Sequence, residues 1–381
     1  MTSIAGELNI SISYTDTNID SRIESSRPLH ASKIFTGKSI THTLTTIPLL
    51  FNICAKAQTV TAVRAIESAT EKPSYKQTES FREALITLEN LREQSLRVVM
   101  DWPKYRNEQA EVECISHISL GIAKLMHALE PVKVLDYQGQ PSPNYSFKTS
   151  VELWMIFSEK LSQTIFGSSA NDWLENTYKK EQLDIWAGKE QSQAAKFIHW
   201  LNQKKWKHSG KSNITHIPDI NDIEVRELLK TQGHEFTGHP KWDDQCYELS
   251  WFSRKQCQPH QDNGIYSRMI GRLKEIADLI LKLDTFYIKG TQLESGKSSV
   301  SGIAHSEAAR GRLTHFVEIE NETIKKLVIL APTEWNFHPE GVAVKSLNNL
   351  DAKSPHELHQ QAELLIHAID PCVGFNLSIE G

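Results

Sequence analysis

The chain has 381 residues, of which 39% are hydrophobic and 23% are charged. These proportions are close to globular averages, so they exclude collagen-like and largely disordered chains. The 42 basic and 47 acidic residues give a net charge of −5, which argues against a nucleic-acid partner. No stretch approaches the ~18 to 20 apolar residues of a membrane-spanning helix, so we expect no membrane insertion.

The first residues and the cysteines indicate in which cellular compartment we expect the protein. The opening residues, 1–7, have no basic stretch followed by an apolar one, so we expect no signal peptide. The five cysteines are odd in number and widely scattered along the chain. This is not the pattern of a disulfide framework, and it predicts a protein of the reducing cytoplasm.

The N-terminal part predicts two strands followed by helices. Apolar and polar residues alternate over 8–13, which is typical of a half-buried strand, and a second strand returns over 19–23. Residues from about 40 to 70 carry apolar positions at helical spacing. Further helices are predicted over 78–101, 112–129, 149–165, 180–204, 219–231 and 264–286.

The hydrophobic period changes towards the C-terminus. Residues 288–303 are rich in Gly and Ser and predict a loop. Two β-type segments over 314–332, separated by Asn321 and Glu322, predict a β-hairpin. The last helix is predicted over 355–368, because the following proline blocks its continuation, and we expect a coil after it.

The familiar catalytic motifs are absent from the sequence: there is no Walker loop, GxGxxG, HExxH or CxxC. A zinc site at Cys246 and Cys257, with His239 and His260, would need a spacing that matches no standard pattern. The basic segment 202–211 is typical of a solvated loop, and the alternative is a docking site for an acidic partner.

Cys54 and Cys372 stand out by their positions near the two ends. A lone cysteine is most often a small buried hydrophobe. The flanks of both, however, resemble the large subunit of nickel–iron hydrogenases, which reads R-I-C-G-V-C-x-x-x-H near its start and D-P-C-x-x-C-x-x-H near its end. The corresponding segments here are 51–58, followed by the A-V-R-A-I-E of 62–67, and 370–378.

Internal segments extend this resemblance in the same order along the chain. They are similar to the family patterns P-x-Y…E-x-G-P-L-A-R, E-A-P-R-G-x-L-x-H-W and P-T-T-W-N-x-x-P. The matching residues are Pro240, Glu248 and Arg254 in the first, Glu307, Ala308, Arg310, Gly311, Leu313 and His315 in the second, and Pro332, Thr333, Trp335, Asn336 and Pro339 in the third.

The departures from the family patterns remove half of the thiolates that bind metal in the enzymes. Phe51 and Phe375 stand where the family has the other two cysteines. Gln58 and Ser378 replace the motif histidines, and Ala5 replaces the glutamate used for proton transfer. Two cysteines cannot provide a four-thiolate nickel site, so we expect neither bound nickel nor hydrogen cleavage, and the chain is predicted not to be an enzyme.

This pattern resembles the HupK/HoxV-type hydrogenase maturation proteins, which look like large subunits with one cysteine kept at each end. The resemblance implies a scaffold that holds an Fe(CN)2CO unit, with a HypC/HypD-type complex and the large-subunit precursor as partners. Soft thiolates suit such iron, and cyanide nitrogens want charged or hydroxyl donors. The implied site comprises Cys54 and Cys372 as iron ligands, Arg310, Pro332, Thr333 and Gln58 around the cyanides, and Glu248, Glu307 and His315 as structural motif residues.

The resemblance also implies a mainly helical α+β fold like that of the large subunit, forming a single unit over 1–381. We expect an N-terminal β element at 1–28, a helical core at 29–287, a β-hairpin region at 304–340, and a C-terminal helix with a cysteine-bearing tail at 355–381.

Alternatives stay open at this point. Without the motif, Arg310 would be read as a salt-bridge residue with Glu307 or Glu248 as its partner. For the whole chain, the other functions are a metal-free docking protein for maturation factors and a divergent metal-dependent oxidoreductase.

Overall fold

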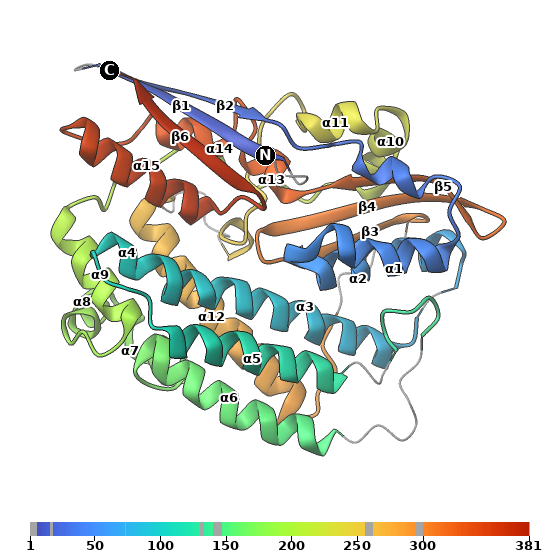
Figure 1. The fold of residues 1–381 in the computed structure, drawn as a ribbon, viewed down its shortest axis with the longest axis horizontal. Coiled ribbons are helices and arrows are strands. Elements are labelled where there is room, and N and C mark those ends of the chain that lie inside the picture. Colours follow the sequence, from blue (N-terminus) through green and yellow to red (C-terminus); the bar gives the residue numbers. More distant parts are fainter. Residues whose placement is uncertain are drawn as a thin grey trace. The chain divides into compact units, whose positions relative to one another are not determined.

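The computed structural model describes residues 6–15, 18–72, 74–129, 133–139, 147–255, 262–294 and 300–380. The chain divides into two compact units, whose helices and strands are labelled in Figure 1. Unit 1 comprises Met1–Lys72, Trp206–Arg268 and Lys297–Gly381, and unit 2 comprises Pro73–Lys205 and Met269–Gly296. The single-unit organisation expected above stays a prediction.

One sheet of unit 1 joins the two ends of the chain. Strands β1 (Glu7–Thr15) and β2 (Asn18–Ser25) are antiparallel, which confirms the two predicted strands. Strand β6 (Gly374–Glu380) pairs with β1 in parallel, so the expected C-terminal coil is wrong. The tail alternates apolar and polar residues from Phe375 onward, and this alternation suits a strand as soon as β1 provides a partner.

A second sheet in unit 1 has the antiparallel order β3-β4-β5. The predicted hairpin is confirmed as β4 (Gly311–Glu320) and β5 (Thr323–Leu330). The turn residues Asn321 and Glu322 have φ of 51° and 58°. Strand β3 (Ile303–Ala308) extends the hairpin by a third strand that the sequence did not predict.

The helical segment predicted at about 40 to 70 is broken near its middle. Helix α1 (Ile40–Leu50) ends after Pro48, whose nitrogen cannot donate within the helix. Helix α2 (Ala55–Ala69) begins after the 3-10 turn Asn52–Cys54 and packs against β3 and β4. The break places Cys54 at the start of α2.

The remaining helices of unit 1 are short, apart from the last. The predicted helices near 219–231 and 355–368 are confirmed as α10 and α15. These helices are α10 (Asp222–Thr231), α11 (His234–Gly238), α13 (Pro332–Asn336), α14 (Val342–Leu347) and α15 (Pro355–Ile369).

Among the residues that the structure describes, unit 2 consists of helices and the turns that join them. Its long helices α3, α5 and α6 lie side by side (Figure 1), and most of α12 also belongs to this unit. The bounds are α3 (Lys76–Leu96), α4 (Trp102–Tyr105), α5 (Val112–Leu129), α6 (Lys148–Phe166), α7 (Ala170–Asn176), α8 (Lys180–Gly188), α9 (Gln193–Lys204) and α12 (Ile265–Tyr287).

Two details of unit 2 refine the predicted helices. The segment 180–204 is two helices, because Ser192 caps the start of α9 by accepting from the N–H of Ala195. Helices α5 and α6 approach closely at Gly121, where an added Cβ would lie 2.3 Å from the ring of Phe157. Glycine is therefore needed at this crossing.

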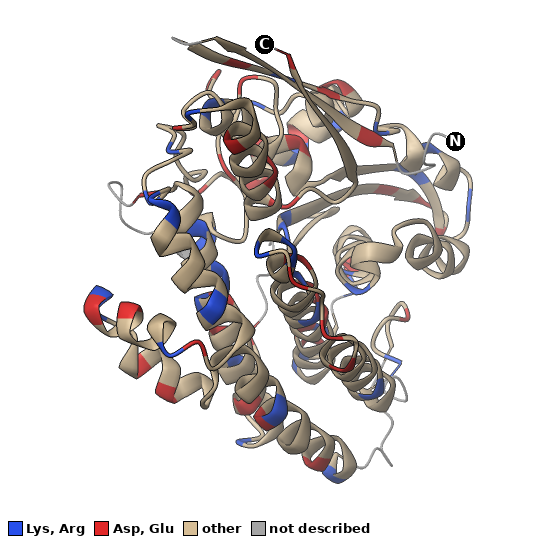
Figure 2. Cartoon of the chain, turned by 60° about the vertical axis from the view of Figure 1, so that its left-hand side comes forward, with Lys and Arg blue, Asp and Glu red and all other residues tan. Residues whose placement is uncertain are grey.

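The charged residues of the two signs are mixed along the chain. Figure 2 shows acidic and basic residues interspersed along the helices, in keeping with a net charge of only −5. Among the described residues, no helix is both long enough and apolar enough to cross a bilayer.

Candidate functional site

Cys372 is a half-buried free thiol between α15 and β6. Helix α15 stops at Asp370, whose φ of 70° lies in the left-handed region, and Pro371 prevents a further turn. The N–H of Cys372 donates to Oγ1 of Thr333 at 3.2 Å. The sulfur-bearing residue is thus tied to α13 on one side and leads into β6 on the other.

Arg310 fixes the peptide just before Cys372. Only 4% of Arg310 is exposed, and its Nε donates to the carbonyl oxygen of Pro371 at 3.2 Å. The same nitrogen lies 3.4 Å from Oδ1 of the buried Asp370. The salt-bridge alternative for Arg310 is therefore right in kind, and Asp370 is a partner that the sequence did not suggest.

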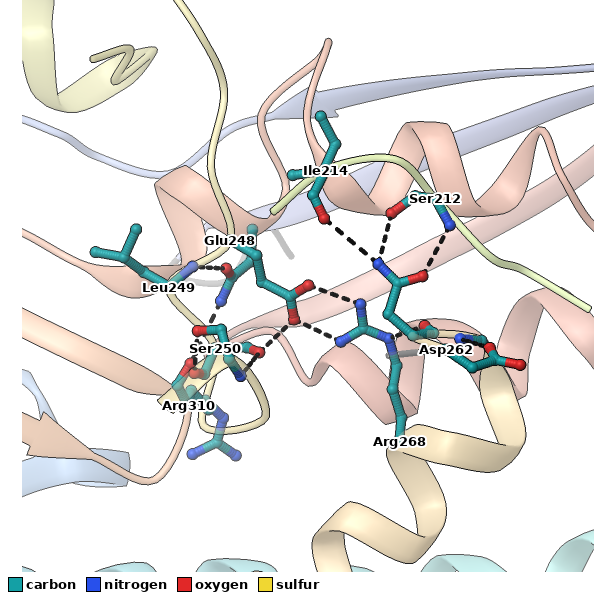
Figure 3. Close-up of polar contacts among 12 residues, drawn as sticks. Ser212, Ile214, Glu248, Leu249, Ser250, Asp262, Arg268 and Arg310 are labelled. Carbon is teal, nitrogen blue, oxygen red and sulfur yellow. Dashed lines mark hydrogen bonds and ion pairs between the residues drawn. The ribbon is translucent and has the colours of Figure 1, made fainter. Parts of the chain in front are cut away.

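Glu307 and Glu248 form ion pairs with Arg254, Arg312 and Arg268. Glu307 pairs with Arg254 at 3.0 Å and with Arg312 at 2.9 Å, and these arginines lower its pKa although burial opposes them. The carboxylate of Glu248 accepts hydrogen bonds from both terminal nitrogens of Arg268, with 2.8 Å between Nη2 and Oε2 (Figure 3). Both members of the Glu248 pair are buried, so this bidentate contact is a strong internal tie.

Asn336 connects the Glu248 segment to the Arg310 turn. Its Oδ1 accepts from the N–H of Leu249 at 2.9 Å, and its Nδ2 donates to the carbonyl oxygen of Arg310 at 3.4 Å. Figure 3 shows Leu249 and Arg310 close together, on the side of the Glu248 carboxylate that faces away from Arg268. The three internal motifs of the sequence therefore form one hydrogen-bonded network in the fold.

The residue after Arg310 in this turn, Gly311, cannot carry a side chain. Its φ is 131°, and a Cβ there would lie 1.6 Å from the carbonyl oxygen of Leu249. Only glycine permits this approach of two backbones.

Gln58, which stands where the large-subunit motif has a histidine, is buried in the first turns of α2. Its Oε1 lies 2.8 Å from Nε2 of His315 in β4. Complete burial lowers the pKa of His315 to about 3, so the ring is neutral at pH 7. Because an amide oxygen only accepts, Nε2 carries the proton and donates it to Gln58.

Cys54 is a half-buried residue at the start of α2, one turn before Gln58. The preceding residues Leu49, Leu50 and Ile53 are exposed, Leu49 by 77%. Helix α2 packs on β3 and β4, and Arg310 in the β3–β4 turn contacts the Cys372 segment. The structure therefore attaches both cysteine-bearing segments to the same sheet of unit 1.

Further potential ligands near the cysteines are few. In the part of the chain that the structure describes, no three His, Cys, Asp or Glu side chains are grouped so that they could hold a metal ion. Cys246 lies 3.3 Å from Nδ1 of His338, while Cys257 and His260 of the alternative zinc site lie outside the described residues.

Sequence reasoning missed the roles of Asp370 and Arg268. It treated Asp370 only as the residue at which the helix stops. The aspartate of the family's D-P-C motif was a signal that this side chain makes a specific contact. Arg268 lies outside every motif segment, so no local pattern pointed to its pairing with Glu248.

Comparisons with known proteins find similarity to hydrogenases and to hydrogenase expression/formation proteins. Residues 224–375 match a family model described as nickel-dependent hydrogenase. The chain is 24% identical over 373 residues to the hydrogenase expression/formation protein HoxV of Cupriavidus necator, covering 93% of this chain and 92% of that protein. It is 23% identical over 387 residues to the hydrogenase expression/formation protein HupK of Azotobacter vinelandii, covering 99% of each.

The chain is thus similar over nearly its whole length to the HoxV and HupK hydrogenase expression/formation proteins, and over residues 224–375 to the nickel-dependent hydrogenases. The family model covers the residues of the Arg310 network and Cys372, whereas Cys54 and Gln58 precede it.

Solved structures confirm the expected fold of this chain. The nickel–iron–selenium hydrogenase of Desulfovibrio vulgaris Hildenborough aligns with a TM-score of 0.64 at 12% identity, over 94% of each chain. The corresponding enzyme of Desulfomicrobium baculatum gives 0.65 at 11% identity, over 95% of each chain. The mainly helical α+β fold is that of the hydrogenase large subunit.

Proposed function

We propose that this chain is a non-catalytic scaffold in nickel–iron hydrogenase maturation and holds an Fe(CN)2CO unit on its way to the large-subunit precursor. Its full-length relatives are named hydrogenase expression/formation proteins, which supports a role in maturation. The observation that carries the finer proposal is the fixing of Cys372 by Arg310 and Thr333, the residues expected to face the cyanides.

The two retained thiols suit this cargo. Thiolate is a soft ligand that binds iron well. Iron that already carries two cyanides and a carbonyl needs few ligands from the protein, so Cys54 and Cys372 could serve without a larger cluster of side chains. Nickel is not part of the proposal, because the two further cysteines of the enzymes are phenylalanines here.

Thr333 and Arg310 can act on the cyanides while holding Cys372. The hydroxyl of Thr333 accepts from Cys372, and its own proton remains for donation to a cyanide nitrogen. The buried guanidinium of Arg310 brings a positive charge to the same peptide. Pro332 begins α13 and suits its first position, and Gln58 is held by His315 beside the Cys54 segment.

The partners in this proposal are a HypC/HypD-type complex as donor of the iron unit and the large-subunit precursor as acceptor. A donor could complete the iron shell during transfer, since the described residues group no third ligand with the cysteines.

Infrared spectroscopy tests the proposal directly. The protein is purified anaerobically from cells that also express the iron-assembly proteins, and cyanide and carbonyl stretches are recorded. We expect bands that disappear in Cys54→Ala and Cys372→Ala. Cys114→Ala is the matched control, because that half-buried thiol lies on α5 of unit 2, and it should retain the bands. Absence of both bands and iron from the unaltered protein would overturn the carrier role.

A metal-free docking protein is the second candidate. It is favoured by the lack of any group of three potential ligands among the described residues. In that case a Cys54→Ala, Cys372→Ala double variant would still support hydrogenase maturation in a cell that lacks the natural gene, whereas a carrier would lose it.

A further inference from the structure

We propose that an ion pair between Arg27 and Glu334 positions Cys372, an inference that rests on the proposed function only for the claim that Cys372 carries iron. Glu334 follows Thr333 in α13. The large-subunit pattern P-T-T-W-N has threonine at this place, so the carboxylate is a departure of this chain from that pattern.

The pair lies largely out of solvent. Nη1 of Arg27 contacts Oε1 of Glu334, and the two side chains are 17% and 8% exposed. Burial raises the pKa of Glu334, and the charge of Arg27 opposes that rise. A carboxylate buried to this degree is costly without its partner, so the two side chains hold each other in place.

Arg27 is connected to Cys372 through the first sheet. The preceding Ser26 donates its N–H to the carbonyl oxygen of Glu7 at 3.0 Å and accepts from the N–H of Glu7 at its Oγ, also at 3.0 Å. Glu7 is in turn the register partner of Gly374 in the parallel β1–β6 pair. Gly374 is only two residues beyond Cys372.

Glu334 is connected to Cys372 by the shorter route. Its neighbour Thr333 accepts the hydrogen bond from the N–H of Cys372 at 3.2 Å. The contacts therefore close a circuit that runs from Cys372 through β6, β1 and Arg27 to Glu334 and back through Thr333. The Arg27–Glu334 pair is the link that ties the strand side of this circuit to the α13 side.

The backbone around Arg27 is built for close approach. Gly6 has a φ of 74°, and a Cβ at this position would lie 2.6 Å from Cα of Arg27. Glycine alone combines this conformation with this contact. The residue before β1 thus packs directly against the backbone of Arg27 and limits the movement of that backbone.

Breaking the link should loosen Cys372 locally. The strand pairing and the Thr333 hydrogen bond would each remain, but they would no longer be held at a fixed separation. We expect the Cys372 segment to open more often, while the buried cores of the two sheets stay intact.

The test measures alkylation of each cysteine by iodoacetamide in the metal-free, full-length protein, followed by peptide mass spectrometry. Glu334→Gln and Glu334→Thr should raise the rate at Cys372 by about fivefold and change that at Cys54 by less than about twofold. Lys241→Met is the matched control, because it breaks the exposed Lys241–Glu340 pair of the same unit and should leave Cys372 unchanged.

Charge exchange provides the rescue. The double variant Arg27→Glu, Glu334→Arg should return the Cys372 rate towards that of the unaltered protein, as a positioning role requires. The inference is overturned by an unchanged Cys372 rate in both Glu334 variants, or by an equal rise at every cysteine, which would mean general loosening. If the Cys372 rate responds but the loaded protein shows no infrared bands, positioning stands and the carrier function fails.

Discussion

The two cysteine-bearing segments of unit 1 are built in opposite ways. Cys372 is held by residues that are distant in sequence: Arg310 binds the preceding carbonyl and Thr333 accepts its N–H. Cys54 lies at a break between two helices, beside the exposed Leu49 and Leu50. The C-terminal segment is therefore held by contacts from distant parts of the chain, whereas the N-terminal one presents apolar surface next to its thiol.

The largest effect should come from removing Arg310. Arg310→Leu removes the guanidinium that lies 3.4 Å from the buried Asp370, and loss of one partner of a buried pair costs about 3 to 5 kcal/mol. Urea unfolding should show this loss for unit 1. Arg312→Leu is the control, because Arg312 is 40% exposed and its removal should cost about 1 kcal/mol or less. Equal losses in both variants would contradict a special role for the Arg310–Asp370 pair.

The next effect is a pH dependence from His315 on the Cys54 side. Its pKa is about 3 in the folded chain against an ordinary 6.5, so between these values the unfolded state binds more protons. Stability should therefore fall as pH drops from 6.5 towards 3, by at most about 1.4 kcal/mol per pH unit. Urea unfolding at pH 7 and pH 5 measures the fall.

A His315→Gln variant isolates this contribution, because it keeps a hydrogen-bonding side chain opposite Gln58 but has no titrating ring. Its stability should depend less on pH than that of the unaltered chain. Identical pH profiles of the two proteins would show that His315 does not carry the effect.

A smaller effect is expected at Thr333. Thr333→Val removes the acceptor of the Cys372 N–H, so hydrogen exchange at that amide should become about five- to tenfold faster, as expected for one lost hydrogen bond. Thr333→Ser keeps the hydroxyl and should preserve the protection. If valine protects the amide as well as serine does, the Cys372 segment is held by other contacts.

The smallest effect should be found beside Cys54. Leu49→Ser changes a side chain that is 77% exposed, so the free energy of unfolding should stay within about 0.5 kcal/mol. Leu44→Ala, on the buried side of the same helix α1, should cost about 2 kcal/mol or more in the same urea titration. A large cost for Leu49→Ser would mean that this surface is part of the fold and not open.

Local patterns in the sequence predicted most of the elements. The alternation in β1 and β2, the β4–β5 hairpin and the long helices of unit 2 all follow from period and turn residues, which act over neighbouring positions. The break at Asn52–Cys54 and the strand at Gly374–Glu380 were missed. The first depends on how α1 ends after Pro48, and the second needs β1, which lies at the other end of the chain.

The sequence alone determined which residues to consider for the site: the two retained cysteines, the motif residues around Arg310 and Thr333, and the losses at Phe51 and Phe375. Only the tertiary structure decided the pairings among them. Arg310 binds the Asp370–Pro371 peptide, Glu248 binds Arg268, and Glu334 binds Arg27. Each pairing joins side chains distant in sequence, and buried charges choose the partner that the fold brings within reach, because an unpaired charge in the interior is costly.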